Sequence, residues 1–83
     1  MTVRNKAFRK AMEKAGLGAV QLEKNEGYFW IWSDDSEMNN AIMLLDSQSI
    51  YVYAFNHMSI EDWVKTIREM IEEGMRRMNN EEV

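Results

Sequence analysis

The chain has 83 residues, no cysteine and a formal net charge of −4, with 46% hydrophobic and 29% charged residues. The length predicts one domain over residues 1–83, with frayed ends at about 1–3 and 79–83, and the composition excludes disorder, disulfides and thiolate metal sites. The N-terminus lacks the apolar run of a signal peptide, and no stretch approaches the roughly 18 apolar residues of a membrane span. We therefore expect a cytoplasmic protein with no membrane contact.

The first third of the chain predicts a helix followed by a hairpin. Residues 4–15 have helical spacing on one apolar face, formed by Ala7, Phe8, Ala11, Met12 and Ala15. Residues 19–24 alternate like a half-buried strand, and residues 28–32 are an unbroken apolar strand rich in β-formers. The turn between them, residues 25–27, ends in Gly27, where we expect a positive φ.

The middle of the chain is predicted as loop and strand. Residues 33–40 are polar and are predicted as a loop, and residues 46–49 as a turn. Residues 41–45 are predicted as a third strand, although so short an apolar run is also compatible with a helix. Residues 50–55 are predicted as a fourth strand.

A long helix is predicted to follow Ser59, which is a natural N-cap with Asp62 three residues later. Its apolar stripe continues over five turns and comprises Ile60, Trp63, Val64, Ile67, Met70, Ile71, Met75 and Met78. Gly74 lies on this stripe, where the missing side chain would allow a close approach. The resulting order, α-β-β-β-β-α, predicts a two-layer α+β fold. Its antiparallel meander has four strands, or three if residues 41–45 are not a strand, and both helices cover one sheet face.

Aromatic residues gather in the two best-marked strands, where side chains alternate between the faces. One predicted face therefore carries a larger aromatic set, Tyr28, Trp30, Trp32, Tyr51, Tyr53 and Phe55. The other carries a smaller set, Phe29, Ile31, Ile50, Val52 and Ala54. If the helices cover the smaller set, the rings form a large exposed patch of the kind that binds proteins. The alternatives are that the aromatic set is itself the core, or that loops cover the rings.

Charge is divided unevenly along the chain. Residues 1–18 carry a net charge of +4, whereas residues 19–83 carry −8. Aromatic sheets can stack on single-stranded nucleic acid, but the acidic strand region would repel phosphates, and the first helix is the only basic wall available. We therefore expect a protein partner, or a second copy of the chain in a homodimer, through Tyr28, Trp30, Trp32, Tyr51, Tyr53 and Phe55, and we do not expect nucleic acid.

Catalytic and metal-binding signatures are weak. His57 is the single histidine, and no nucleophile stands at a recognisable spacing from it. Residues 34–37 lack the spacing of a calcium loop, and Gly16 and Gly18 precede a strand, unlike a phosphate-binding loop. We expect no enzymatic activity, no metal, no cofactor and no small-molecule ligand.

The predicted function is a small protein-binding module. The alternatives are an acidic decoy that inhibits a nucleic-acid-binding protein, and a single-stranded nucleic-acid binder. In being short, acidic, rich in methionine and without motifs, the chain resembles the small single-domain proteins that phages and prophages encode. That resemblance implies a host protein as the partner.

Overall fold

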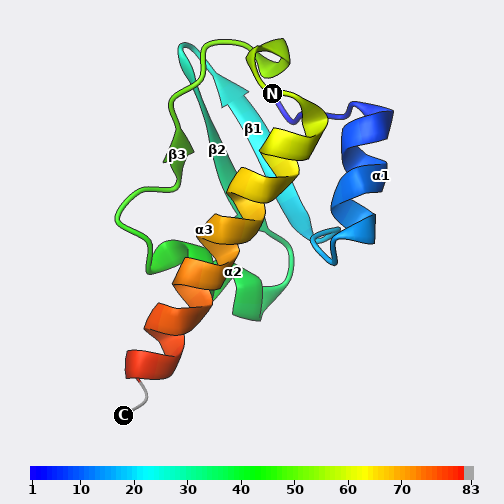
Figure 1. Ribbon diagram of the computed structural model, residues 1–83. Coiled ribbons are helices and arrows are strands. Elements are labelled where there is room, and N and C mark those ends of the chain that lie inside the picture. The colour runs from blue at the N-terminus through cyan, green and yellow to red at the C-terminus, as the bar shows by residue number, and fades with distance from the viewer. Residues whose placement is uncertain (82–83) are drawn as a thin grey trace.

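Figure 1 shows the computed structural model, which describes residues 1–81. Its elements are α1 (Lys6–Lys14), β1 (Val20–Asn25), β2 (Tyr28–Ser33), α2 (Ser36–Met43), β3 (Ser49–Ile50), the 3-10 turn η1 (Phe55–His57) and α3 (Ile60–Glu81). The strands form an antiparallel sheet in the order β1-β2-β3. The predicted α+β class is confirmed, but the sheet of the described residues has three strands and not four.

The hairpin of β1 and β2 is confirmed, and its register organises the rest of the molecule. Asn25 pairs with Tyr28 across the tight turn, in which Gly27 has the predicted positive φ of 82°. Beside β1, Val3 donates its N–H to the carbonyl of Leu22 at 2.8 Å, so the first residues line the edge of the sheet. Of the ends at which fraying is predicted, residues 82 and 83 lie outside the described residues.

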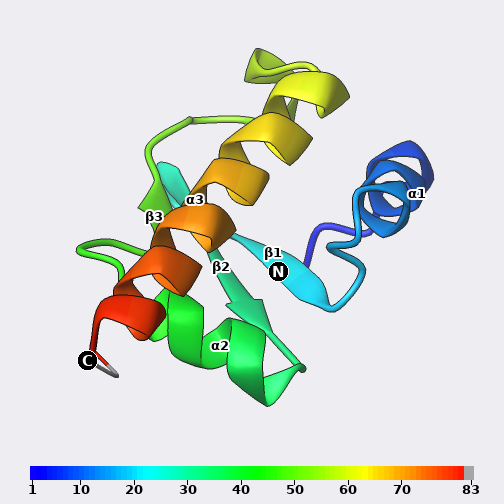
Figure 2. The ribbon, with the colours of Figure 1, turned by 60° about the horizontal axis from the view of Figure 1, so that its bottom comes forward.

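The helices pack on one face of the sheet, the inner face. α3 crosses the sheet obliquely and α1 lies beside it near β1, as both views show (Figures 1 and 2). Phe29, Ile31 and Ile50 point into this layer and are buried with helical side chains, among them Phe8, Met12, Trp63 and Ile67. Three residues of the smaller apolar set therefore belong to the core, and Val52 packs against it, so the alternative that the larger aromatic set forms the core is wrong.

The loop predicted for residues 33–40 and the strand predicted for residues 41–45 are both wrong, because a helix occupies this segment. Asp35 caps α2 by accepting a hydrogen bond from the N–H of Met38 at 3.0 Å. Met38, Ala41 and Ile42 then follow at helical spacing and pack into the core. The polar residues that resemble a loop are the start and the solvent side of this helix.

The strand predicted for residues 50–55 ends at Ile50, and the chain then bends toward α3. Phe55 turns into the core, where its ring stacks on Trp63 at 5.5 Å and meets the edge of Phe8 at 5.5 Å. The indole N–H of Trp63 also donates to the carbonyl of Phe55 at 2.7 Å. These two ring contacts and the hydrogen bond outweigh the further residues of an edge strand, so Phe55 is not on the face that parity predicts.

The start and the close approach predicted for α3 are confirmed. The Ser59 hydroxyl accepts a hydrogen bond from the N–H of Asp62 at 3.0 Å. Gly74 lies directly against α2, and a Cβ at this position would clash with the carbonyl of Ala41. The two helices can pack this closely only because residue 74 has no side chain.

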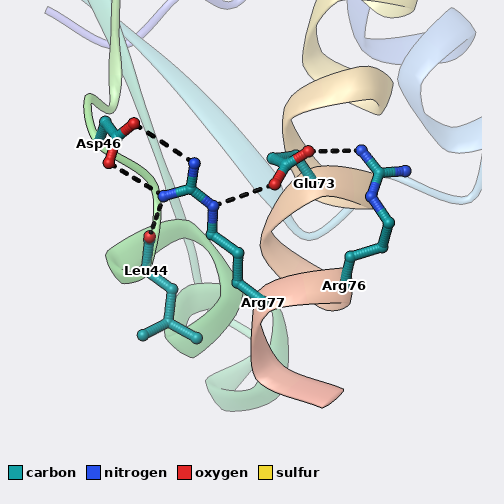
Figure 3. A network of polar contacts seen from close by, with 5 residues as sticks. All are labelled: Leu44, Asp46, Glu73, Arg76 and Arg77. Atoms are coloured by element: carbon teal, nitrogen blue, oxygen red, sulfur yellow. Dashed lines mark hydrogen bonds and ion pairs between the residues drawn. The ribbon is translucent and has the colours of Figure 1, made fainter. Parts of the chain in front are cut away.

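Arg77 joins α3 to the segment between α2 and β3 (Figure 3). Its guanidinium donates to the carbonyl of Leu44 at 2.9 Å and to both carboxylate oxygens of Asp46, at 3.0 and 3.3 Å. It also donates to Glu73 at 3.0 Å, and Glu73 receives a second hydrogen bond from Arg76. Leu44 is the C-cap of α2, so the contact satisfies a helix end and holds two helices together.

Candidate functional site

The candidate site is the sheet face opposite the helices, here called the outer face. It consists of the residues of β1 and β2 that alternate with the core residues, together with Ser49 and Tyr51 at β3: Gln21, Glu23, Asn25, Tyr28, Trp30, Trp32, Ser49 and Tyr51. In β2 every second residue is buried, and Tyr28, Trp30 and Trp32 occupy the half-buried positions between them. One strand thus supplies both the centre of the core and the row of rings on the outer face.

The structure brings four of the six predicted aromatic residues together. The rings of Tyr28 and Tyr51 lie 6.1 Å apart, next to Trp30 and Trp32 along β2. Tyr51 is 79% exposed, whereas the other three are half-buried. Tyr53 lies beyond the end of β3 and stacks on His57 at 6.4 Å, and Phe55 is in the core.

Glu23 is a residue of this face that its sequence position alone does not single out. It lies directly opposite Trp30 across the hairpin. Its Oε2 accepts hydrogen bonds from the Thr2 hydroxyl at 2.6 Å and from the indole N–H of Trp32 at 3.0 Å. A correct hairpin register would have identified the pair with Trp30, because facing residues in antiparallel strands are in side-chain contact.

The Glu23 carboxyl remains charged at neutral pH. Burial raises its pKa, but the hydrogen bonds from Thr2 and Trp32 and the N-terminal ammonium more than offset this, so that the pKa lies below its ordinary value. The ammonium nitrogen is 3.8 Å from Oε1, and the Glu23 side chain is 13% exposed. A fixed negative charge is therefore set among the rings of the outer face.

Polar groups at the two ends of the hairpin hold its shape. The amide of Asn25 donates to the hydroxyl of Tyr28 at 2.8 Å and orients that ring at the turn. At the other end, the hydroxyl of Ser33 donates to the carbonyl of Ala19 at 2.9 Å and closes the hairpin. The rings are thus presented by a braced strand pair and not by a loop.

A hollow of about 380 Å³ lies between α1 and α3, on the helical side of the molecule. It is lined by the apolar residues Ala11, Ile60 and Val64 and by the charged residues Glu61, Lys65 and Arg68. It is shallow and carries charges of both signs. The outer face offers more aromatic surface and a single charge, and is the stronger candidate.

The described residues carry little that points to catalysis or to metal binding. Within residues 1–81, no three side chains of the kinds that bind metals converge on one point. His57 is exposed and in contact with Tyr53. No helix in this part of the chain combines the length and the apolar character needed to cross a membrane.

Comparison with known proteins leaves the site to be interpreted from its own geometry. No protein-family model, curated protein or solved structure matches this chain.

Proposed function

We propose that this protein is a non-enzymatic protein-binding module whose contact surface is the outer face. The observation that carries the proposal is the row of Tyr28, Trp30, Trp32 and Tyr51 on a face against which none of the described helices packs. Tyrosine and tryptophan are enriched in the energetic centres of protein interfaces. The residues that alternate with Tyr28, Trp30 and Trp32 in β2 are fixed in the core. The side chains of these three residues would therefore lose little conformational entropy on binding.

Contact through the face fits this protein better than contact through the edge of the sheet. β3 has only two residues, so it offers a short template for an added strand. The N–H of Ser49 is already donated to the hydroxyl of Ser47 at 3.1 Å. A partner would therefore bind across the side chains and not through backbone pairing.

Two other functions have less support. For a nucleic-acid binder, the cations of α1 are misplaced, because α1 packs by Phe8 and Met12 on the inner side of the sheet, where its lysines are exposed and away from the aromatic row. For an acidic decoy, several carboxylates are already engaged within the fold. Asp35 caps α2, and Asp46 and Glu73 pair with arginines.

The proposal can be tested before the natural partner is identified. Ligands are selected from a library of random displayed peptides, and each is measured against the wild type, Trp30→Thr and Tyr53→Thr. Light scattering over a wide concentration range measures contact with a second copy in parallel. Threonine keeps the strand propensity at position 30. Tyr53, which is 72% exposed but lies off the outer face, is the matched control.

We expect binding or self-association that Trp30→Thr weakens by roughly tenfold or more, in the range of interface hot spots, and that Tyr53→Thr leaves unchanged. A strict monomer that yields no peptide ligand contradicts the proposal. Ligands that bind Trp30→Thr as tightly as the wild type contradict it equally.

A further inference from the structure

The outer face has a chemical feature that bears on the identity of its partner. Among its eight residues, the only ionisable acid or base that is charged at neutral pH is Glu23, which sits between Trp30 and Trp32. A carboxylate bordered by aromatic rings is suited to a cation, because the rings attract positive charge and the carboxylate pairs with it.

The existing contacts of Glu23 leave room for such a pairing. The two hydrogen bonds of 2.6 and 3.0 Å go to Oε2 and come from neutral donors, Thr2 and Trp32. Within residues 1–81, the charged group that pairs with Oε1 is the N-terminal ammonium, at 3.8 Å. That ammonium also donates to the carbonyl of Lys24 at 3.0 Å and belongs to an exposed residue, so the ion pair is weak.

Apart from the N-terminal ammonium, the charged side chains around the outer face are acidic. Glu26 in the hairpin turn and Asp34 and Glu37 near the start of α2 are exposed. Lys24, the one cation in the strands, is directed to the inner side, where its Nζ lies 5.4 Å from the centre of the Phe29 ring. A basic protein would be attracted to this side of the molecule, and an acidic one would be repelled.

We propose that the partner of the outer face is a basic protein that presents an arginine, whose guanidinium stacks on Trp30 and pairs with Glu23. This inference rests on the proposed function and specifies the chemistry of the partner. Arginine fits better than lysine, because its planar group can stack on a ring and donate to a carboxylate at the same time. Arginine is also enriched at interface centres.

A second copy of this chain is a poorer occupant. A two-fold dimer through the outer faces would bring the two Glu23 carboxylates toward each other with no cation supplied from either face. Of the ten basic residues of the chain, four lie in α1 and four in α3, and both helices are on the opposite side of the sheet. The charge layout therefore favours a different, basic protein.

The three tryptophans supply the test. A capped Gly-Arg-Gly peptide is titrated into ¹⁵N-labelled protein, and the indole N–H signals are followed by NMR. The isosteric peptide with citrulline in place of arginine is the control ligand. Trp32 reports on Glu23 through its hydrogen bond, Trp30 reports on stacking, and Trp63, buried and bonded to Phe55, is the internal reference.

We expect saturable shifts of the Trp30 and Trp32 signals with the arginine peptide, at an affinity roughly tenfold above that of the citrulline peptide. Trp63 should not shift. Glu23→Gln should remove the preference for arginine, whereas Glu26→Gln, at the exposed turn, should keep it. If Glu23→Gln shifts the Trp63 signal and so disturbs the core, the comparison of the two peptides on the wild type still decides.

Equal affinity for the two peptides, or no shift at Trp30 and Trp32, overturns the inference. If the inference fails but Trp30→Thr still weakens the binding of peptides from the random library, the proposed function stands and only the chemistry of the partner is wrong. If Trp30→Thr weakens the binding of no library peptide either, the proposed function and the inference about the partner both fail.

Discussion

Gly74 shows how a single residue sets the spacing between two helices. A Cβ there would overlap the carbonyl of Ala41, so α2 would have to move away from α3. We predict that Gly74→Ala lowers the free energy of unfolding by about 1–3 kcal/mol, although alanine favours a helix by about 1 kcal/mol over glycine. Urea unfolding measures the change. Glu69→Ala, exposed on the same helix, is the control and should stay within about 0.5 kcal/mol. An unchanged or more stable Gly74→Ala would show that the helices are not this close.

The residue scale also marks a limit of sequence reasoning. The alternation of β2 predicts that Trp30 and Trp32 share a face, because that property depends only on the chain itself. The hydrogen bond from Trp32 to Glu23 depends on the register between two strands and on the position of Thr2. Phe55 departs from its predicted face because of contacts with Trp63 in the helix that follows and with Phe8, which is distant in the sequence.

At the scale of elements, α2 depends on its cap. Asp35 satisfies the N–H of Met38, and α2 is only eight residues long, too short to be stable without its caps and its packing. We predict that Asp35→Ala destabilises the protein by about 0.5–2 kcal/mol. Asp34→Ala, one residue earlier and exposed, is the matched control and should have little effect. Thermal unfolding of the two variants decides. Equal losses would contradict the capping role.

Arg77 and Arg76 form a second matched pair at this scale. Both bind Glu73, but only Arg77 also reaches Leu44 and Asp46 (Figure 3). Arg77→Gln should therefore lower the melting temperature more than Arg76→Gln, and should speed hydrogen exchange at the end of α2. If the two variants behave alike, the contact between α3 and the segment after α2 contributes nothing measurable.

The elements that the sequence predicts best are long or strongly patterned. The helix after Ser59 and the hairpin around Gly27 each have a clear period and a marked boundary. α2 is missed because its polar first turn resembles a loop and the apolar run of residues 41–45, which begins in its last turn and continues past its end, resembles a strand. The segment after Ile50 leaves the sheet for tertiary reasons that no local pattern carries.

At the scale of the whole molecule, the lowered pKa values of three carboxyl groups predict that the stability of the fold depends on pH. Burial raises the pKa of Glu23, but the hydrogen bonds from Thr2 and Trp32 outweigh burial, so the pKa is lowered. The pKa of Asp46 is lowered mainly by hydrogen bonds from Arg77. The pKa of Glu73 is lowered mainly by the hydrogen bond from Arg76. Between the folded and the ordinary pKa values, the unfolded state binds more protons than the folded state. Stability should therefore be at its full value above about pH 4.5 and fall as the pH drops through the folded pKa values.

Urea midpoints at several pH values between 7 and 3 measure this dependence. The wild-type midpoint should fall with the pH, and Arg77→Gln should reduce the fall, because Asp46 then loses the contacts that lower its pKa and Glu73 keeps only its hydrogen bond with Arg76. A midpoint that is constant or rises toward pH 3 would contradict the assignment of these carboxylates.

The molecule as a whole has one sheet face committed to the core and one that we propose is committed to a partner. NMR shift mapping of a selected peptide ligand on the ¹⁵N-labelled protein tests this most directly. We predict shifts concentrated at the outer residues of β1 and β2 and at the indoles of Trp30 and Trp32, with Trp63 unchanged. Shifts concentrated instead at Ala11, Val64 and Arg68, in the hollow between α1 and α3, would contradict the proposed contact surface.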